Sequence, residues 1–341
     1  MTVLRKKRFW FGLVITAVFL YLVFRQVEIH ELADALAAAD YPWLVPALGV
    51  YLGGYLVRAL RWKILLRPIT SLPWTRFLPP LMLGFMTNNL LPARAGEFVQ
   101  AYVLGKREGL SKSSAFATVV MQRTLDGIVM VALALIVFTW FRLPFDHASD
   151  DFLQLVEAAI KVTAVLFAAV LAVLFALITW RDRAASLLSR LSRVLPAKWA
   201  GRVERILHSF LEGLSVLRHR GDSAFALLLT LGAWLLESAA YGFVLHAFGM
   251  DLPYTAAVML MAVINLGIMV PSSPGYIGPF EFFGVGTLLL FGVAKHVSLP
   301  AVLVIHTIVW LPITLWGFYY LWTLRLSFQE IHRQVEAKEG M

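Results

Sequence analysis

The chain contains no cysteine among its 341 residues. Disulfides, thiolate catalysis and cysteine-ligated metal sites are therefore excluded. Charged residues are scarce as well, at 15% of the sequence, whereas hydrophobic residues make up 60%. Because an average soluble domain carries about 25% charged residues, this composition predicts one integral membrane domain over residues 1–341.

Motifs of several enzyme classes are missing too. No Gly-x-x-x-x-Gly-Lys-Ser/Thr phosphate loop occurs, no dinucleotide-binding glycine pattern follows a strand, and no His-Glu-x-x-His occurs. The histidines are scattered, so we expect no metal, no cofactor and no enzymatic activity. The net charge of +9 does not indicate nucleic acid, because the basic residues flank apolar runs, where they set topology and contact lipid headgroups.

Apolar runs long enough for about 20 residues of membrane-spanning helix define the predicted fold. Such runs occur at 9–27, 42–62, 113–140, 158–180, 224–248 and 300–323. Two pairs of shorter runs are predicted to form re-entrant hairpins, 77–91 with 97–105 and 254–270 with 280–294, although the second pair is long enough to span more fully. The first run is expected to be an uncleaved span, because small residues suited to signal-peptide cleavage lie well beyond it.

The charges between the runs predict an all-α polytopic protein with six full spans and both termini in the cytoplasm. Residues 28–42 are acidic and are expected to form an outside loop. The stretches 42–140 and 224–323 each run span, hairpin, span in opposite orientation, which predicts inverted repeats; chance alignment of two Pro/Gly breaks is the alternative. The basic segment 181–222 is predicted to be a cytoplasmic connector of amphipathic helices, either a plain linker or a regulatory element.

Proline and glycine interrupt the helices of both hairpins. The first break contains Asn89, Pro92, Arg94, Gly96 and Glu97, and the second contains Pro271, Pro274, Gly275, Gly278 and Glu281. An interrupted helix leaves backbone groups that lipid cannot satisfy, so protein must enclose it or a watery cavity must reach it. Paired interruptions in corresponding places of two halves indicate the binding site of a transporter.

Acidic and basic residues follow these breaks directly. Arg94 and Glu97 either form a local ion pair that closes the hairpin tip, or Arg94 contacts an anionic headgroup with help from backbone N–H groups at the start of the second arm. Glu281 is the counterpart of Glu97 in the second half. Because its loop contains no arginine, Glu281 must find a distant partner, stay protonated or face water.

A second polar group lies inside the span that begins near residue 113 and consists of Gln122, Arg123 and Asp126. Arg123 and Asp126 are three residues apart on one helix face and can pair. Such a pair either binds this helix to a hairpin or serves proton or substrate coupling at a cavity.

Other polar residues in the spans have simpler explanations. Arg58 and Arg61 lie near the inner end of the second span, where snorkelling to the membrane surface explains them. Glu237, His246 and His306 are isolated polar groups. Most residues of this kind are satisfied packing partners; the alternative is contact with a substrate or ion pathway.

The motif Asn89-x-x-Pro92-x-Arg94-x-Gly96-Glu97, followed by Ser111, Ala115, Gln122-Arg123 and Asp126, resembles the lysylphosphatidylglycerol synthase transmembrane region family. The motif Pro271-x-x-Pro274-Gly275-x-x-Gly278-x-x-Glu281 is similar to that family's second signature. The resemblance covers essentially the whole chain. It implies lipid handling, as in the flippase-like portion of bifunctional lipid-aminoacylating proteins and in stand-alone members, some of them linked to hopanoid or glycolipid pathways.

The chain departs from that family pattern in two places. Only about 19 residues follow Trp322, so the soluble aminoacyl-transferase domain of the bifunctional type is expected to be absent. Phe98-Val99-Gln100 stands where an arginine typically follows the glutamate of the first motif.

The sequence therefore predicts a flippase-like transporter in the bacterial inner membrane, which moves an anionic lipid, phosphate-bearing or isoprenoid, through a polar cavity between the hairpin tips. The expected substrate-binding residues are Arg94, Glu97, Arg123, Asp126, Glu281, Asn89 and Gln122. Within this set the arginines would offset headgroup charge, and the acids would gate or accept protons. The alternative is a membrane component of a lipid or glycolipid biosynthesis pathway, as a transferase accessory or a scaffold for lipid-biosynthesis enzymes; a nucleic-acid partner is not expected.

Overall fold

The computed structural model describes residues 7–25, 28–91, 95–140, 220–269 and 273–325, with isolated positions at 154, 158, 165 and 169. Within these ranges the chain forms helices and no strands. The α-helices are α1 (Lys7–Phe24), α2 (Ile29–Ala37), α3 (Leu44–Leu66), α4 (Leu78–Leu90), α5 (Gly96–Glu108), α6 (Lys112–Trp140), α10 (Arg220–Ala247), α11 (Tyr254–Gly267), α12 (Pro279–Leu290) and α13 (Lys295–Thr323). The short 3-10 helices are η2 (Tyr41–Trp43), η3 (Trp74–Phe77) and η6 (Pro274–Tyr276).

Among the described helices, those long and apolar enough to cross a membrane cover Tyr41–Leu66, Lys112–Val137, Gly221–Ala247 and Lys295–Thr323. They coincide with four of the predicted spans. The first predicted run contains most of helix α1, whose segment Leu13–Phe24 is apolar. The run at 158–180 and the connector at 181–222 lie almost entirely outside the described residues. The chain is thus an all-α membrane protein, while the count of six spans and the orientation of the termini stay predictions.

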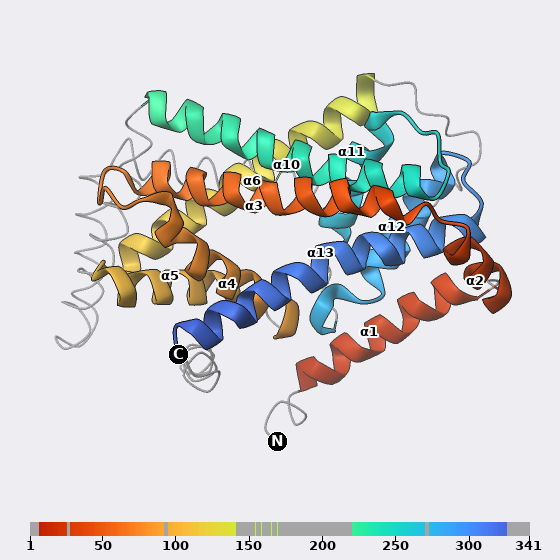
Figure 1. Ribbon diagram of the computed structural model, residues 1–341, viewed down its shortest axis with the longest axis horizontal. Helices are drawn as coiled ribbons and strands as arrows, with labels where there is room; N and C mark the ends of the chain where they lie inside the picture. The colour runs from red at the N-terminus through yellow and green to blue at the C-terminus, as the bar shows by residue number, and fades with distance from the viewer. Residues whose placement is uncertain are drawn as a thin grey trace.

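Helices α3 and α10 lie antiparallel along their whole length (Figure 1). At one end the Asp40 amide donates to the Ala247 carbonyl over 2.8 Å. At the other end Arg67 bonds Asp222 over 2.9 Å. Because the two helices are joined at both ends, residues at equal depth face each other. This arrangement decides which charged side chains of α3 and α10 can pair.

The arms of both predicted hairpins are helices: α4 packs on α5, and α11 packs on α12. Each pair depends on a glycine at its crossing. A Cβ on Gly96 would lie 2.0 Å from the Gly84 carbonyl oxygen, and a Cβ on Gly267 would lie 2.0 Å from the Phe283 ring. The two pairs occupy opposite halves of Figure 1. Re-entry into a bilayer and the repeat boundaries stay predictions.

Two large apolar cores join helices from both halves of the chain. The larger core joins buried side chains of α6 and α10 to α13, including Met259, Phe283 and Ile305. A second core is built mainly on α3 and α4, around Trp62 and Leu81. The hairpins are therefore part of the packed interior.

Helix α2 and turn η2 occupy most of the connection at 28–42. Leu32 on α2 packs against the larger core, as an apolar side chain on one face of a short amphipathic helix does. That this connection lies outside stays a prediction.

Candidate functional site

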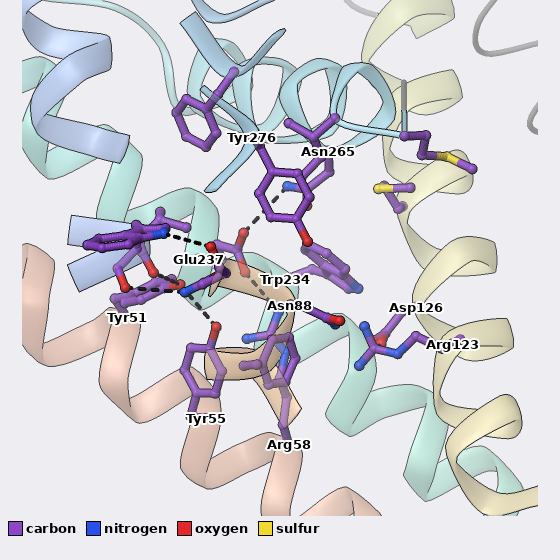
Figure 2. A pocket seen from close by; sticks show the side chains of 18 of the residues that line it. Tyr51, Tyr55, Arg58, Asn88, Arg123, Asp126, Trp234, Glu237, Asn265 and Tyr276 are labelled. Carbon is purple, nitrogen blue, oxygen red and sulfur yellow. Dashed lines mark hydrogen bonds and ion pairs between the residues drawn. The ribbon is translucent and has the colours of Figure 1, made fainter. Parts of the chain in front are cut away.

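A cavity of about 350 Å³ opens between the two hairpin tips and the long helices (Figure 2). Its lining consists of Tyr51, Tyr55, Arg58, Phe85, Asn88, Asn89, Glu97, Arg123, Asp126, Gly127, Met130, Trp234, Glu237, Tyr241, Asn265, Ile268, Met269, Tyr276, Phe280, His306, Val309 and Trp310. Aromatic rings thus alternate with carboxylates, amides and guanidinium groups.

The cavity lies near the middle of every long helix that lines it. The lining segments are 51–58 in α3, 123–130 in α6, 234–241 in α10 and 306–310 in α13. A helix of 23 residues, such as α3, is about 35 Å long at 1.5 Å per residue. If these helices cross the membrane, the cavity is near the midplane, where transporters bind their substrates.

Both hairpin tips contact the same two turns of α13. The Trp310 indole donates to the Asn89 carbonyl over 3.4 Å, and the Asn89 amide donates to Thr314 over 2.9 Å. One turn earlier, His306 Nε2 lies 2.8 Å from the Gly275 carbonyl. A Cβ on Gly275 would be 3.8 Å from the Asn89 carbonyl oxygen. The tips therefore lie next to each other, as the sequence predicted.

Arg58 and Glu237 form an ion pair across α3 and α10, with 2.8 Å between Nη2 and Oε2. The two side chains are only 4% and 7% exposed. The Arg58 guanidinium also lies 5.1 Å from the ring centres of Tyr55 and Trp234. The expectation that Arg58 snorkels and that Glu237 is isolated is wrong. Helix α3 continues to Leu66, which places Arg58 deeper than the predicted span allowed.

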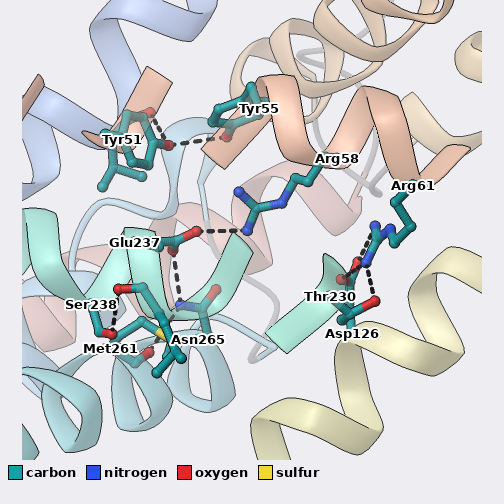
Figure 3. Close-up of polar contacts among 12 residues, drawn as sticks. Tyr51, Tyr55, Arg58, Arg61, Asp126, Thr230, Glu237, Ser238, Met261 and Asn265 are labelled. Atoms are coloured by element: carbon teal, nitrogen blue, oxygen red, sulfur yellow. Dashed lines mark hydrogen bonds and ion pairs between the residues drawn. The ribbon is translucent and has the colours of Figure 1, made fainter. Parts of the chain in front are cut away.

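Asp126 contacts two arginines, of which Figure 3 shows Arg61 beside it and Figure 2 shows Arg123. It accepts hydrogen bonds from Arg61 and forms the predicted ion pair with Arg123, whose Nη2 is 3.2 Å from Oδ2. Arg61 is fully buried and also donates to Thr230 over 3.0 Å, so snorkelling is wrong for this residue as well. Two cations share one carboxylate, which leaves this wall of the cavity with one positive charge in excess.

Glu281 pairs with His306, which is distant in the sequence and was expected to be isolated. Oε1 of Glu281 is 2.5 Å from Nδ1 of His306, and Oε2 accepts the Gly278 amide over 2.7 Å. Phe280 stacks on the His306 ring at 4.1 Å between centres. Glu281 lies just behind the lining, while His306 is part of it.

The first tip is held by Asn88. Its side-chain oxygen accepts the Gly96 amide over 2.8 Å, and its amide donates to Oε1 of Glu97 over 3.2 Å. Arg94 lies outside the described part of the chain, so the predicted Arg94–Glu97 pair stays a prediction. Pro92 and Pro271 lie outside it as well.

Of the predicted substrate-binding residues, Asn89, Glu97, Arg123 and Asp126 line the cavity, whereas Gln122 is buried away from it. The predicted break residues Gly96, Pro274, Gly275 and Gly278 are found at the ends of α5, η6 and α12, as expected. Sequence reasoning missed Arg58, Glu237 and His306. The signal for Arg58 and Glu237 was that two residues of opposite charge lie at equal depth on two helices.

The described lining balances its charges closely. Three carboxylates and two guanidinium groups face the cavity, and Arg61 adds a third cation behind Asp126. Arg123 keeps the most exposed side chain of these arginines, at 34%. Among the residues that the structure describes, no group of three or more His, Asp or Glu side chains is arranged to hold a metal ion.

Comparison with known proteins gives a family match over nearly the whole chain. The model of the lysylphosphatidylglycerol synthase TM region matches residues 9–317. A UPF0104 membrane protein of Methanothermobacter thermautotrophicus is 28% identical over 80% of this chain and 83% of its own length. A second UPF0104 membrane protein of that organism is 26% identical, over 84% of each chain. Glycosyltransferase AglD of Haloferax volcanii is 25% identical over 87% of this chain, but only 51% of its own length is covered.

Proposed function

The chain belongs to the lysylphosphatidylglycerol synthase TM region family, and on that premise we propose that it moves a lipid with a polar, anionic headgroup between membrane leaflets. The headgroup enters the cavity between the hairpin tips, while the tails stay in the lipid around the helices. The observation that carries this proposal is the cavity itself, which gathers ionised side chains in the middle of four long apolar helices.

Ionised residues at this depth are unfavourable by at least about 2.5 kcal/mol each on insertion scales. Structural pairing alone accounts for a pair sealed between helices, but these pairs border an open volume. Intramembrane charges beside a cavity are a mark of substrate or ion pathways. The exposed apolar side chains on the other faces of these helices, such as Val45, Leu228 and Leu315, suit contact with lipid tails.

Arg123 supports the preference for an anionic headgroup. Arg58 is neutralised by Glu237, and the single charge of Asp126 is shared between Arg61 and Arg123. Arg123 therefore presents the excess positive charge on the α6 wall of the cavity, whereas Glu97 presents a carboxylate on the first tip. Its guanidinium is fixed in place by the Phe85 ring at 5.3 Å, and a guanidinium is well suited to phosphate oxygens.

The experiment is a translocation assay in proteoliposomes that contain fluorescently labelled phosphatidylglycerol, with dithionite added outside to bleach the outer leaflet. Arg123→Gln keeps most of the side-chain volume and removes the charge. We expect at least a tenfold loss of rate, because the lost charge contact is worth about 1.4 kcal/mol or more.

Arg67→Gln is the matched control, because Arg67 pairs with Asp222 at a similar distance but is 66% exposed outside the cavity. It should retain the wild-type rate. Equal rates for the wild type and Arg123→Gln would refute Arg123 as the headgroup contact. Wild-type proteoliposomes no faster than protein-free vesicles, with phosphatidylglycerol and with an isoprenoid phosphate probe, would refute the transport proposal.

A role in glycolipid synthesis is the second candidate, and the likeness to glycosyltransferase AglD favours it. The region shared with this chain covers about half of that protein, so the shared part would serve as a membrane partner of a transferase, handling the lipid carrier. The bacterial inner membrane stays a prediction here, because the named relatives come from archaea.

The two candidates separate in an assay with purified protein and a labelled lipid-linked sugar. Passage of that lipid between leaflets without any change in its chemistry supports transport. Release or transfer of the sugar by the purified chain would refute the expectation that it is no enzyme.

A further inference from the structure

Glu281 and His306 form a buried polar contact between the second hairpin and α13. Glu281 is 2% exposed and His306 is 9% exposed. The histidine uses both ring nitrogens, Nδ1 toward Glu281 over 2.5 Å and Nε2 toward the Gly275 carbonyl over 2.8 Å. It therefore bridges the first turn of α12 and the tip of the same hairpin.

The number of protons in this bridge follows from its acceptors. A carbonyl oxygen can only accept, so Nε2 must carry a hydrogen. The contact between Nδ1 and Glu281 then requires one further proton, either on the ring or on the carboxyl group. If that proton leaves, the neutral imidazole has one N–H for two acceptors, and one of the two contacts must become a repulsion between lone pairs.

We propose that Glu281 and His306 form a proton-binding site that latches the tip of the second hairpin to α13. This inference rests on the proposed function and names its coupling ion. With the proton bound, both contacts hold. Without it, the N–H stays with the charged carboxylate, which makes the stronger hydrogen bond, and the Gly275 carbonyl is released.

Charged groups near the pair come from several elements. Packed against α12 and α13, helices α4 and α11 carry no charged residue, and the described side chains of α1 from Leu13 to Phe24 carry none either. Helix α2 also packs against α13 and carries His30, Glu31 and Asp34, of which His30 is exposed. The charged groups that share the cavity with His306 belong to α3, α5, α6 and α10, namely Arg58, Glu97, Arg123, Asp126 and Glu237. All of these except Glu97 are ion-paired with one another or with Arg61.

Release of Gly275 would act directly on the cavity. The next residue, Tyr276, lines the cavity and has φ of +61°, which is strained for a residue with a side chain (Figure 2). Gly275 also borders Trp310, which holds the first tip through Asn89. Loss of the proton therefore removes one contact of a strained segment at the point where the two tips meet, while Thr16 of α1 still bonds Ser273 and Ile277 on either side.

The test measures the position of the tip without any lipid transport. The chain has no cysteine, so spin labels attach only at introduced sites. Ile277→Cys on the tip and Val45→Cys on α3 are both exposed, at 45% and 74%. After labelling, the distance between the two spin labels is measured by pulsed electron paramagnetic resonance in nanodiscs, from about pH 5 to about pH 8.

We expect one narrow distance at low pH and a second, shifted or broader population that grows as the pH rises. Glu281→Gln should hold the low-pH distance at every pH, because its amide can donate to Nδ1 while its oxygen still accepts the Gly278 amide. His306→Phe should show the released population at every pH. His296→Gln changes another, exposed histidine of α13 and should titrate like the wild type.

A wild-type distance that does not depend on pH would overturn the inference, even if lipid transport is observed. A pH dependence that survives in Glu281→Gln would overturn it too, because the titrating group would lie elsewhere. Conversely, a titrating tip in a protein that moves no lipid would support the proton site and refute the transport proposal.

Discussion

Removing one partner of the Arg58–Glu237 pair should destabilise the protein far more than removing both. At 2.8 Å and an effective dielectric constant of about 20, the attraction between the two charges is about 6 kcal/mol. Removing the two ions from water costs several kcal/mol per ion and offsets this attraction. The intact pair therefore contributes little net stability. Glu237→Met leaves the Arg58 charge buried without a carboxylate. We expect the free energy of unfolding to fall by about 3 kcal/mol. This value is at the lower end of the range for broken buried ion pairs, because the unfolded chain in a micelle also finds partners for its polar groups.

The assay is a double-mutant cycle on unfolding in mixed detergent micelles, with Arg58→Met, Glu237→Met and the double variant. The double variant should lie within about 1 kcal/mol of the wild type, because apolar side chains of similar volume replace both ions. The surface pair Arg67–Asp222 has nearly the same distance, 2.9 Å, and Asp222→Asn should cost less than about 1 kcal/mol. Similar losses for Glu237→Met and Asp222→Asn would refute the claim that burial makes the difference.

Three further changes test the packing and charge of the site. Gly96→Ala places a Cβ 2.0 Å from the Gly84 carbonyl oxygen and should lower stability in thermal unfolding by about 1–3 kcal/mol. In the control Gly49→Ala the new Cβ has nothing within 4 Å, so this change should be neutral. Equal melting temperatures of the two variants would contradict the close approach of α4 and α5. Asp126→Asn leaves Arg61 and Arg123 without their carboxylate and should cost about 3 kcal/mol on the same unfolding assay, with wild-type stability as the contrary result. Arg123→Gln should slow translocation of phosphatidylglycerol at least tenfold, because it removes a charge contact to the headgroup, while Arg67→Gln should not.

The helices and their interruptions were predictable because they depend on local signals. The lengths of the apolar runs predicted the long helices, and Gly96, Gly275 and Gly278 predicted the breaks between the hairpin arms. The Arg123–Asp126 contact followed from a three-residue spacing on one helix. That the two tips meet followed from their matching positions in the two halves.

The pairing of buried charges was not predictable in the same way. Arg58 and Glu237 are 179 residues apart, and Arg61 and Asp126 are 65 apart, so no spacing rule connects them. Arg58 was placed too near a helix end, because the expected span stopped at 62 and α3 reaches Leu66. The Arg58–Glu237 pair emerges only once α3 is known to lie antiparallel to α10, and the Arg61–Asp126 pair only once α3 is known to pack on α6.

The central claim is that the cavity is a polar route for lipid headgroups. A measurement of whether water-soluble reagents reach the cavity tests it most directly. Met130→Cys lies in the lining, and Ala134→Cys lies one turn further along α6, fully buried and outside the lining. In the otherwise cysteine-free protein, a small anionic thiosulfonate should modify Met130→Cys and leave Ala134→Cys unmodified, and phosphatidylglycerol should slow the reaction. If Met130→Cys proves as unreactive as Ala134→Cys, the cavity is dry and the route for headgroups is contradicted.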